Sequence, residues 1–218
     1  MASTAPQIVV GVDESPAATR AAVWAIDEAI SRQIPLCLLG GTESDVRRVA
    51  AAVQASGRPV TIRTAVTATP AQALLDASHT AAMVCVGDAA AAVPLLDSPL
   101  CPIAVVRGTG RGQVLAELDG TPHSAAVLQS AVAEARLRSA PLRVVGTGQA
   151  RLDDRPSHWR QRYPDLDARP IRAALLDYLA GRADEVALVV LGAGNPSARA
   201  VLDHTDRTLL VLDRQRLM

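Results

Sequence analysis

The chain has no lysine and no phenylalanine, and these two absences exclude several kinds of chemistry. Its 22 basic residues are all arginine, so it can supply neither a Schiff-base lysine nor the phosphate-binding lysine of a P-loop. Without phenylalanine a base-stacking platform is not expected, and the 22 acidic residues leave a formal net charge of zero. We therefore expect no binding to nucleic acid.

Cysteine and histidine are scarce, and their spacing predicts neither a metal site nor a catalytic group. The three cysteines, Cys37, Cys85 and Cys101, stand in apolar stretches, so we expect reduced, buried packing residues and no disulfide or zinc site. The four histidines are scattered, without a partner at metal or triad spacing. We expect no enzymatic activity. An enzyme of another doubly wound family stays an alternative that no catalytic constellation supports.

Long apolar runs are also missing from the sequence. Crossing a bilayer takes about 20 consecutive apolar residues, and here Arg or Asp interrupts every apolar stretch well before that length. Residues 1–7 have neither a basic start nor a long apolar stretch, so we do not expect them to be a secretion signal. The expected location is the cytoplasm, without membrane association.

What the sequence does contain is an internal repeat. The segment from Ile8 to Gly41 resembles the segment from Val114 to Gly148, with Asp13 aligned to Asp119. Later segments of the two halves also match, among them AAMVCVGD at 81–88 and VALVVLGAG at 186–194. The chain is therefore predicted to hold two domains, 1–108 and 113–218, joined by the glycine-rich stretch 108–112.

Within each half, short apolar runs alternate with segments of helical periodicity, which predicts an α/β fold. Ser15 is predicted to cap a helix that begins at Pro16. The buried face of this helix is expected to hold Ala18, Ala22, Ala25, Ile26 and Ala29, and its exposed face a Glu28–Arg32 ion pair. In the second half Thr121 and Pro122 are predicted to have the same roles as Ser15 and Pro16, and Glu134 and Arg138 to form the corresponding pair. In the first half we expect strands at 8–12, 36–40, 60–66, 83–87 and 103–106 and helices at 16–32, 43–55 and 70–78, with a short helix between the last two strands.

The pattern predicts two tandem, doubly wound, parallel five-stranded sheets of Rossmann-like type. We expect them to pack as an internal pseudo-dimer through their fifth strands, 103–106 and 209–212. The second half departs from the first at 151–170, a polar stretch punctuated by proline, where we expect a long loop with one helical turn at 158–162.

Ligands of doubly wound sheets bind beyond the carboxyl ends of the strands, where the strand order reverses. In this sequence the residues that follow the first and fourth strands of each half occupy that place. The candidate binding residues are Asp13, Ser15 and Gly87, followed by Asp88, in the first half, and Asp119, Thr121, Gly192, Gly194 and Asn195 in the second.

The stretch IVVGVDESPAATRAAVWAIDEA, at 8–29, and CPIAVV, at 101–106, resemble the universal stress protein family. The internal duplication resembles the tandem members of that family. The resemblance implies an adenine nucleotide alpha hydrolase-like fold and a role in the stress response. In ATP-binding members a loop of the form Gly, two residues, Gly, about nine residues, Gly, Ser or Thr holds the phosphates with bare backbone amides.

Both loops of this chain depart from that form. In the first half Ala90 stands at the second glycine, the third glycine is missing, and Asp88 adds a negative charge. In the second half Gly192 and Gly194 have the wrong spacing, and the terminal Gly-Ser is absent. The expectation is a non-enzymatic stress-response module with a degenerate nucleotide site and no cofactor. The alternative is ATP or AMP in a noncanonical pocket, in the second half, with Gly192, Gly194 and Asn195 at the phosphates.

The acidic and hydroxyl candidates each have a second explanation. Asp13 and Asp119 can accept hydrogen bonds from an adenine or a ribose, or simply stand near a helix N-terminus, where the helix dipole favours an acid. Ser15 and Thr121 need no ligand if they are N-caps. The segment from Arg151 to Arg172, with Trp159 and Tyr163, is expected either to bind a protein partner or an anion, or to cover the sheet edge. Homodimerisation is a further expectation.

Overall fold

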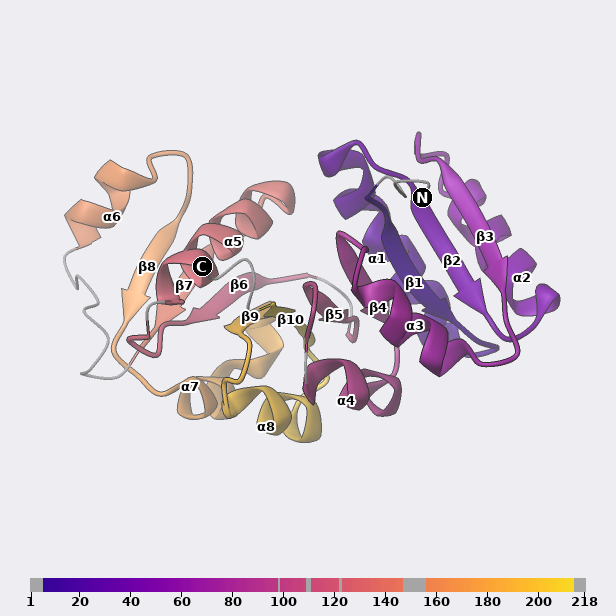
Figure 1. Cartoon of the computed structure of the whole chain (residues 1–218). Helices are drawn as coiled ribbons and strands as arrows, with labels where there is room; N and C mark the ends of the chain where they lie inside the picture. Colours follow the sequence, from indigo (N-terminus) through magenta and orange to yellow (C-terminus); the bar gives the residue numbers. More distant parts are fainter. Residues whose placement is uncertain (1–5, 98, 109–110, 122, 147–155, 214–218) are drawn as a thin grey trace. The chain divides into compact units, whose positions relative to one another are not determined.

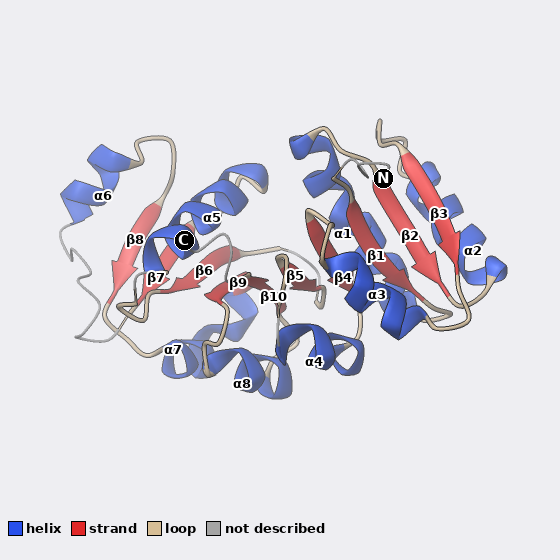
Figure 2. Ribbon diagram, in the orientation of Figure 1, coloured by secondary structure: helices blue, strands red, loops and turns tan. Residues whose placement is uncertain are grey.

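The computed structural model describes residues 6–97, 99–108, 111–121, 123–146 and 156–213. It divides into two compact units, Met1–Arg107 and Gly108–Met218. Within each unit the strands pair in parallel and helices pack on them (Figures 1 and 2). The predicted α/β class is therefore confirmed, and the two units are described separately below.

Unit 1, Met1–Arg107, alternates strands and helices along the chain. Its elements are β1 (Ile8–Val12), α1 (Pro16–Arg32), β2 (Leu36–Gly40), α2 (Glu43–Ala55), β3 (Ile62–Val66), α3 (Pro70–Ser78), β4 (Met83–Val86), α4 (Ala89–Asp97) and β5 (Ile103–Val105). The strand order is β3-β2-β1-β4-β5, and every pairing is parallel. The chain moves outward from β1 to β3 and then returns to β4, so the order reverses between β1 and β4.

This reversal places the helices of unit 1 on both faces of the sheet. Right-handed crossovers in opposite directions put α1 and α2 on one face and α3 and α4 on the other, and each pair is in contact. The contacts of β1 and β4 agree, since Gly11 faces Leu74 of α3 while Gly87 faces the start of α1. The predicted apolar face of α1, from Ala18 to Ala29, is buried against the sheet.

Unit 2, Gly108–Met218, repeats this arrangement. Its elements are β6 (Gln113–Glu117), α5 (Ser124–Leu137), β7 (Leu142–Val145), α6 (Pro156–Arg162), β8 (Ala168–Ile171), α7 (Leu175–Arg182), a 3-10 turn (Ala183–Glu185), β9 (Val186–Gly192), α8 (Ser197–His204) and β10 (Thr208–Leu212). The strand order β8-β7-β6-β9-β10 matches that of unit 1, and all pairings are again parallel. β9, which lies between β6 and β10, is buried along its whole length.

Local signals placed several elements of unit 1 at the predicted residues. β1, α1, β2, α2 and α3 begin and end where the sequence indicated, and Ser15 caps α1 through a hydrogen bond from the Ala18 amide to its Oγ, at 3.2 Å. β3 begins at Ile62 rather than at residue 60, and the Val60 amide donates instead to Arg58 O, at 2.9 Å, in the turn that precedes the strand. β4 and β5 each end one residue earlier than predicted.

The prediction for 151–170 was wrong in part. Residues 156–162 form the helix α6, longer than a single turn, and Ala168–Ile171 is a strand although Pro170 lies within it. An edge strand tolerates proline because one side of its backbone needs no partner, and β8 is the last strand of this order. Residues 151–155, and 109–110 of the predicted joint, lie outside the described residues.

Two further expectations need correction. The Glu28–Arg32 pair forms at 3.0 Å, but the Glu28 side chain is only 1% exposed, since it lies three residues after Ala25 on the buried face of α1. The Glu134–Arg138 pair of unit 2 is buried in the same way. Thr121 is not the N-cap of the next helix, because α5 begins at Ser124 and Asp119 engages the Thr121 hydroxyl.

Candidate functional site

The carboxyl ends of β1 and β4 enclose a small cavity in unit 1. Its volume is about 180 Å³, below the range of roughly 300–1,000 Å³ that is common for small-molecule sites. Asp13, Ser15, Gly87 and Asp88 line its rim, so the structure brings the first-half candidates together. Its walls are apolar and include Leu74 of α3. We call this region the first mouth.

The side chains after β1 bond to their own backbone. Asp13 Oδ1 accepts a hydrogen bond from the Ser15 amide at 2.9 Å, and Ser15 Oγ accepts one from the Ala18 amide at 3.2 Å. These amides open α1, which is where an anionic ligand of a helix N-terminus would bind. Arg48 of α2, which the sequence did not single out, donates to the Asp13 carbonyl oxygen and, at 3.0 Å, to Thr19 Oγ1.

Gly87 is held at the end of β4 by close packing. A Cβ atom at this position would lie 2.3 Å from the carbonyl carbon and oxygen of Ala17 and 2.8 Å from the Ala18 amide nitrogen. Only glycine allows the strand to approach the first turn of α1 so closely. The next residue, Asp88, accepts a hydrogen bond from the Ala90 amide at 3.2 Å, so its carboxylate stands at the start of α4.

In unit 2 Asp119 is the centre of a local hydrogen-bond cluster. Its Oδ1 accepts from the Thr121 amide at 3.0 Å, from the Thr121 hydroxyl at 2.7 Å and from the Ser124 hydroxyl at 3.1 Å. Burial alone raises the pKa of Asp119, but these hydrogen bonds outweigh it and hold the pKa below its ordinary value. The carboxylate is therefore ionised at neutral pH and already engaged by its neighbours.

The loop after β9 is closed by its own side chains. Gly194 has φ +78°, which favours glycine, whereas a Cβ at Gly192 would meet only ordinary contacts, the nearest at 3.5 Å. Asn195 is buried, its Oδ1 accepts from the Ser197 amide at 2.8 Å, and its Nδ2 donates to Glu117 at 2.9 Å. Glu117, at the end of β6, was missed by the sequence reasoning. Its only signal is that it stands where the first half has Gly11.

The equivalent region of unit 2, which we call the second mouth, consists of residues at or just after the carboxyl ends of β6 and β9, namely Glu117, Asp119, Thr121, Gly192 and Asn195. Both mouths carry carboxylates, and hydrogen-bond acceptors of the chain itself already occupy amides at or a few residues before the starts of the neighbouring helices. Among the described residues, no group of three or more His, Cys, Asp or Glu side chains is arranged to hold a metal ion. All three cysteines are buried, as predicted.

Known proteins resemble this chain along nearly its whole length. A universal stress protein of Mycobacterium tuberculosis H37Rv, Rv2028c, is 36% identical over 274 aligned residues, which cover 97% of this chain and 98% of that protein. The chain belongs to the universal stress protein family. A second member from the same organism, Rv2624c, is 31% identical over 97% of each chain. No family model matches the sequence.

Solved structures agree on the fold. A universal stress protein from Archaeoglobus fulgidus superimposes with a TM-score of 0.69 at 12% identity, covering 95% of this chain and 98% of that one. PA1789 from Pseudomonas aeruginosa, described as functionally unknown, gives 0.66 at 17% identity, covering 97% and 93%. The alignment with Rv2028c is longer than the 218 residues of this universal stress protein, which therefore lacks segments that its relative has. In the part of the chain that the structure describes, no helix combines the length and apolarity needed to cross a bilayer.

Proposed function

We propose that this universal stress protein is a non-enzymatic stress-response module whose two mouths do not retain a nucleotide. Membership of the family supports the stress-response role. The observation that carries the nucleotide part is the self-capping of the mouths. The amides of Ser15 and Ala90 in unit 1, and those of Thr121 and Ser197 in unit 2, each donate to an oxygen of a nearby side chain.

A phosphate group would have to displace these acceptors. In the first mouth it would also meet Asp13 and Asp88, two carboxylates on one cavity of about 180 Å³. Like charges at such short range disfavour binding, and the nearby cation, Arg48, is already engaged with the Asp13 carbonyl, Thr19 and Asp45. Gly87 does not argue for a phosphate loop, because its packing against Ala17 already requires glycine.

The alternative places ATP or AMP in the second mouth, at Gly192, Gly194 and Asn195. The side chain of Asn195 is committed on both sides, to the Ser197 amide and to Glu117. Glu117 also puts a carboxylate where phosphate oxygens would lie. These contacts favour the first proposal over the alternative.

The proposal of a non-enzymatic role rests on the state of the acidic groups. A general base works best with a pKa near the working pH, and the hydrogen bonds to Asp119 move its pKa away from neutrality. The same hydrogen bonds leave one of its oxygens with three donors, so it is poorly placed to accept a further proton.

Titration of the purified full-length chain with ATP and with AMP, in the presence of magnesium and by isothermal calorimetry, tests the proposal. Native mass spectrometry of freshly purified protein is the second readout. We expect no saturable heat and no bound nucleotide. The variant Glu117→Gly gives unit 2 the residue that unit 1 has at the equivalent position, Gly11. A gain of nucleotide binding in this variant would identify Glu117 as the group that prevents binding in the second mouth. Saturable micromolar binding by the unaltered chain would overturn the proposal.

A module without catalysis acts through partners, and a protein partner at 151–172 stays a prediction. Trp159 is only 8% exposed and cannot be its anchor, while Arg162 lies over the Tyr163 ring at 5.6 Å. The exposed Arg160 of the same helix is available for contact. Loss of a captured partner in Arg160→Ala would support docking there. Homodimerisation, the internal pseudo-dimer and the cytoplasmic location also stay predictions.

A further inference from the structure

Unit 1 has a second, larger hollow, at the end of the sheet opposite to the first mouth. Its volume is about 580 Å³, within the range typical of small-molecule sites. It lies between the end of α1 and the connection from α2 to β3, and its lining includes Ile30, Ile34 and Val60 together with Gln33, Thr61 and Arg63. We call it the amino-end hollow, since it lies where β2 and β3 begin.

A backbone turn and an ion pair fix the walls of the hollow. α1 is capped at its end by Gln33, whose φ of +56° turns the chain back toward β2 while its amide bonds to the carbonyls of Ala29 and Ile30. On the other side the chain leaves α2 through Gly57, and Arg58 forms an ion pair with Asp27 of α1. The two walls are thus tied to each other by side chains that do not line the hollow.

The electrostatics of the hollow are one-sided. The polar side chains that line it, Gln33, Thr61 and Arg63, include one cation, and no Asp or Glu among the described residues lines it. The Arg63 guanidinium donates to a neutral amide oxygen, Gln7 Oε1, at 3.5 Å, the outer limit of a hydrogen bond. The remaining wall is apolar, so the hollow presents one positive charge beside hydrocarbon.

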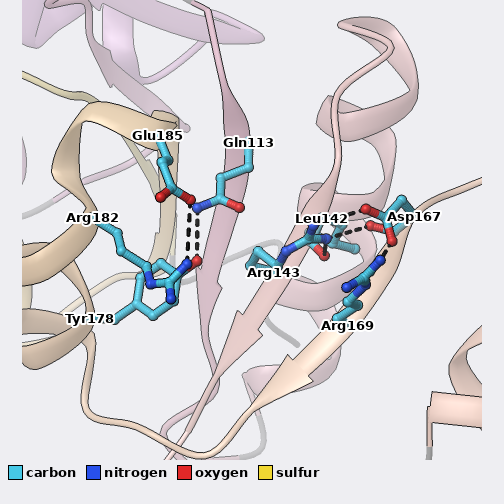
Figure 3. A network of polar contacts seen from close by, with 8 residues as sticks. All are labelled: Gln113, Leu142, Arg143, Asp167, Arg169, Tyr178, Arg182 and Glu185. Carbon is cyan, nitrogen blue, oxygen red and sulfur yellow. Dashed lines mark hydrogen bonds and ion pairs between the residues drawn. The ribbon is translucent and has the colours of Figure 1, made fainter.

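Unit 2 shows how the same position is completed when an acid is present. The Leu36 amide donates to Thr61 O at 2.9 Å, and the Leu142 amide donates to Asp167 O at 3.0 Å, so Thr61 corresponds to Asp167. By the same strand registers, Arg63 of β3 is the equivalent of Arg169 of β8. The Asp167 carboxylate accepts from Arg169 Nε at 2.9 Å and from Arg143 Nη2 at 2.8 Å (Figure 3).

A second acid closes this end of unit 2. By the same spacing Ile30 corresponds to Arg136 and Pro59 to Asp165, and Arg136 binds Asp165 with two hydrogen bonds, at 2.7 and 3.0 Å. Unit 1 therefore replaces both carboxylates, by Thr61 and Pro59, and replaces an arginine by the apolar Ile30. It keeps the edge-strand arginine, without the carboxylate that its counterpart binds.

We propose that the amino-end hollow binds a small amphipathic monocarboxylate, with the carboxylate on Arg63 and the hydrocarbon body against Ile30, Ile34 and Val60. A guanidinium matches a carboxylate through two parallel hydrogen bonds, which is the geometry that Asp165 already uses in unit 2. The carboxylate of the ligand would thus take the place that the Asp167 carboxylate has beside Arg169 in unit 2. This site is distinct from both mouths and does not depend on whether they bind nucleotide.

Calorimetric titration of the full-length chain with sodium octanoate tests this site. We expect saturable binding with one site per chain, and at least about tenfold weaker binding of n-octanol, which lacks the charge. Arg63→Gln should weaken octanoate about tenfold or more, and so should Thr61→Asp, which gives Arg63 the internal acid found in unit 2. The matched control is Thr64→Asp, the same change on an exposed residue of β3 outside the hollow, which should bind octanoate as the unaltered chain does.

Circular dichroism checks that each variant is folded. If Arg63→Gln does not fold, Thr61→Asp alone tests the role of Arg63. Absence of saturable octanoate binding overturns the proposal, as does equal affinity for octanol. Binding of inorganic phosphate as tight as that of octanoate overturns it in favour of a general anion site. Equal loss in Thr61→Asp and Thr64→Asp overturns the assignment to the hollow.

Discussion

Replacing Gly87 by alanine tests whether this glycine is retained for packing or for a phosphate. The new Cβ would lie 2.3 Å from the Ala17 carbonyl carbon and oxygen, whereas non-bonded carbon atoms prefer about 3.5–4.0 Å. Both neighbouring atoms belong to the backbone of α1, so no side chain can rotate away. The end of β4 must instead separate from α1 by about an ångström, on the difference between these distances.

The expected cost follows from that displacement. Overpacking a well-packed region costs about 1–3 kcal/mol, and a clash with rigid backbone belongs at the upper end. Gly192 provides the matched control in unit 2, because its nearest Cβ contact would be 3.5 Å and its φ is not positive. There alanine should be neutral or should stabilise by up to about 1 kcal/mol, since it restricts the unfolded chain.

Scanning calorimetry of the two variants measures the difference. For a chain of this size about 1 kcal/mol shifts Tm by roughly 2–4 °C, so Gly87→Ala should lower Tm by about 6–12 °C and Gly192→Ala should change it by less than about 4 °C. Equal shifts in the two variants, or an unchanged Tm in Gly87→Ala, would refute the reasoning. Gly87 would then be free of packing constraints and again a candidate for a phosphate loop.

Three further changes have outcomes that follow from single contacts. Ser15→Ala removes the cap of α1 and should cost about 1 kcal/mol, measured as a lower Tm; no change would mean that the Ala18 amide finds water at no cost. Asp119→Asn tests the lowered pKa: the ionised carboxylate stabilises the fold above its unfolded pKa of about 3.9, and this contribution is lost as the pH falls through the folded pKa. The variant should therefore lose less Tm than the parent below about pH 4, and an unchanged acid slope would contradict this. Tyr178→Phe removes the hydroxyl that accepts from buried Gln113 Nε2 at 2.8 Å (Figure 3) and should cost about 1–3 kcal/mol in urea unfolding, which an unchanged midpoint would disprove.

The elements that the sequence predicted to the residue are those with strong local signals. α1 is an example, with an N-cap at Ser15, proline at the first position and an alanine-rich face at helical spacing. β1 and β2 are continuous apolar runs that end at turn residues, as buried parallel strands do. Signals of this kind depend on neighbours within a turn or two, which a single sequence contains.

The misses involve position in the sheet or partners distant in sequence. Pro170 argued against a strand, yet β8 lies at the edge of unit 2, and the strand order that makes this harmless is a tertiary property. Spacing correctly paired Glu28 with Arg32 but did not show that Glu28 is buried. Glu117 and Asn195 are 78 residues apart, so their hydrogen bond, which closes the second mouth, had no local signature.

Equivalent positions of the two units differ in charge, and this difference is a stronger argument about function than the missing glycines of the phosphate loops. Unit 2 uses its own acids at both ends of its sheet, Glu117 at the second mouth and Asp167 beside Arg169. Unit 1 has acids at its first mouth, whereas no Asp or Glu among the described residues lines the amino-end hollow, where Arg63 lies beside an apolar wall. An anion drawn to unit 1 should consequently enter the amino-end hollow, away from the strand ends where a nucleotide of this fold would be expected.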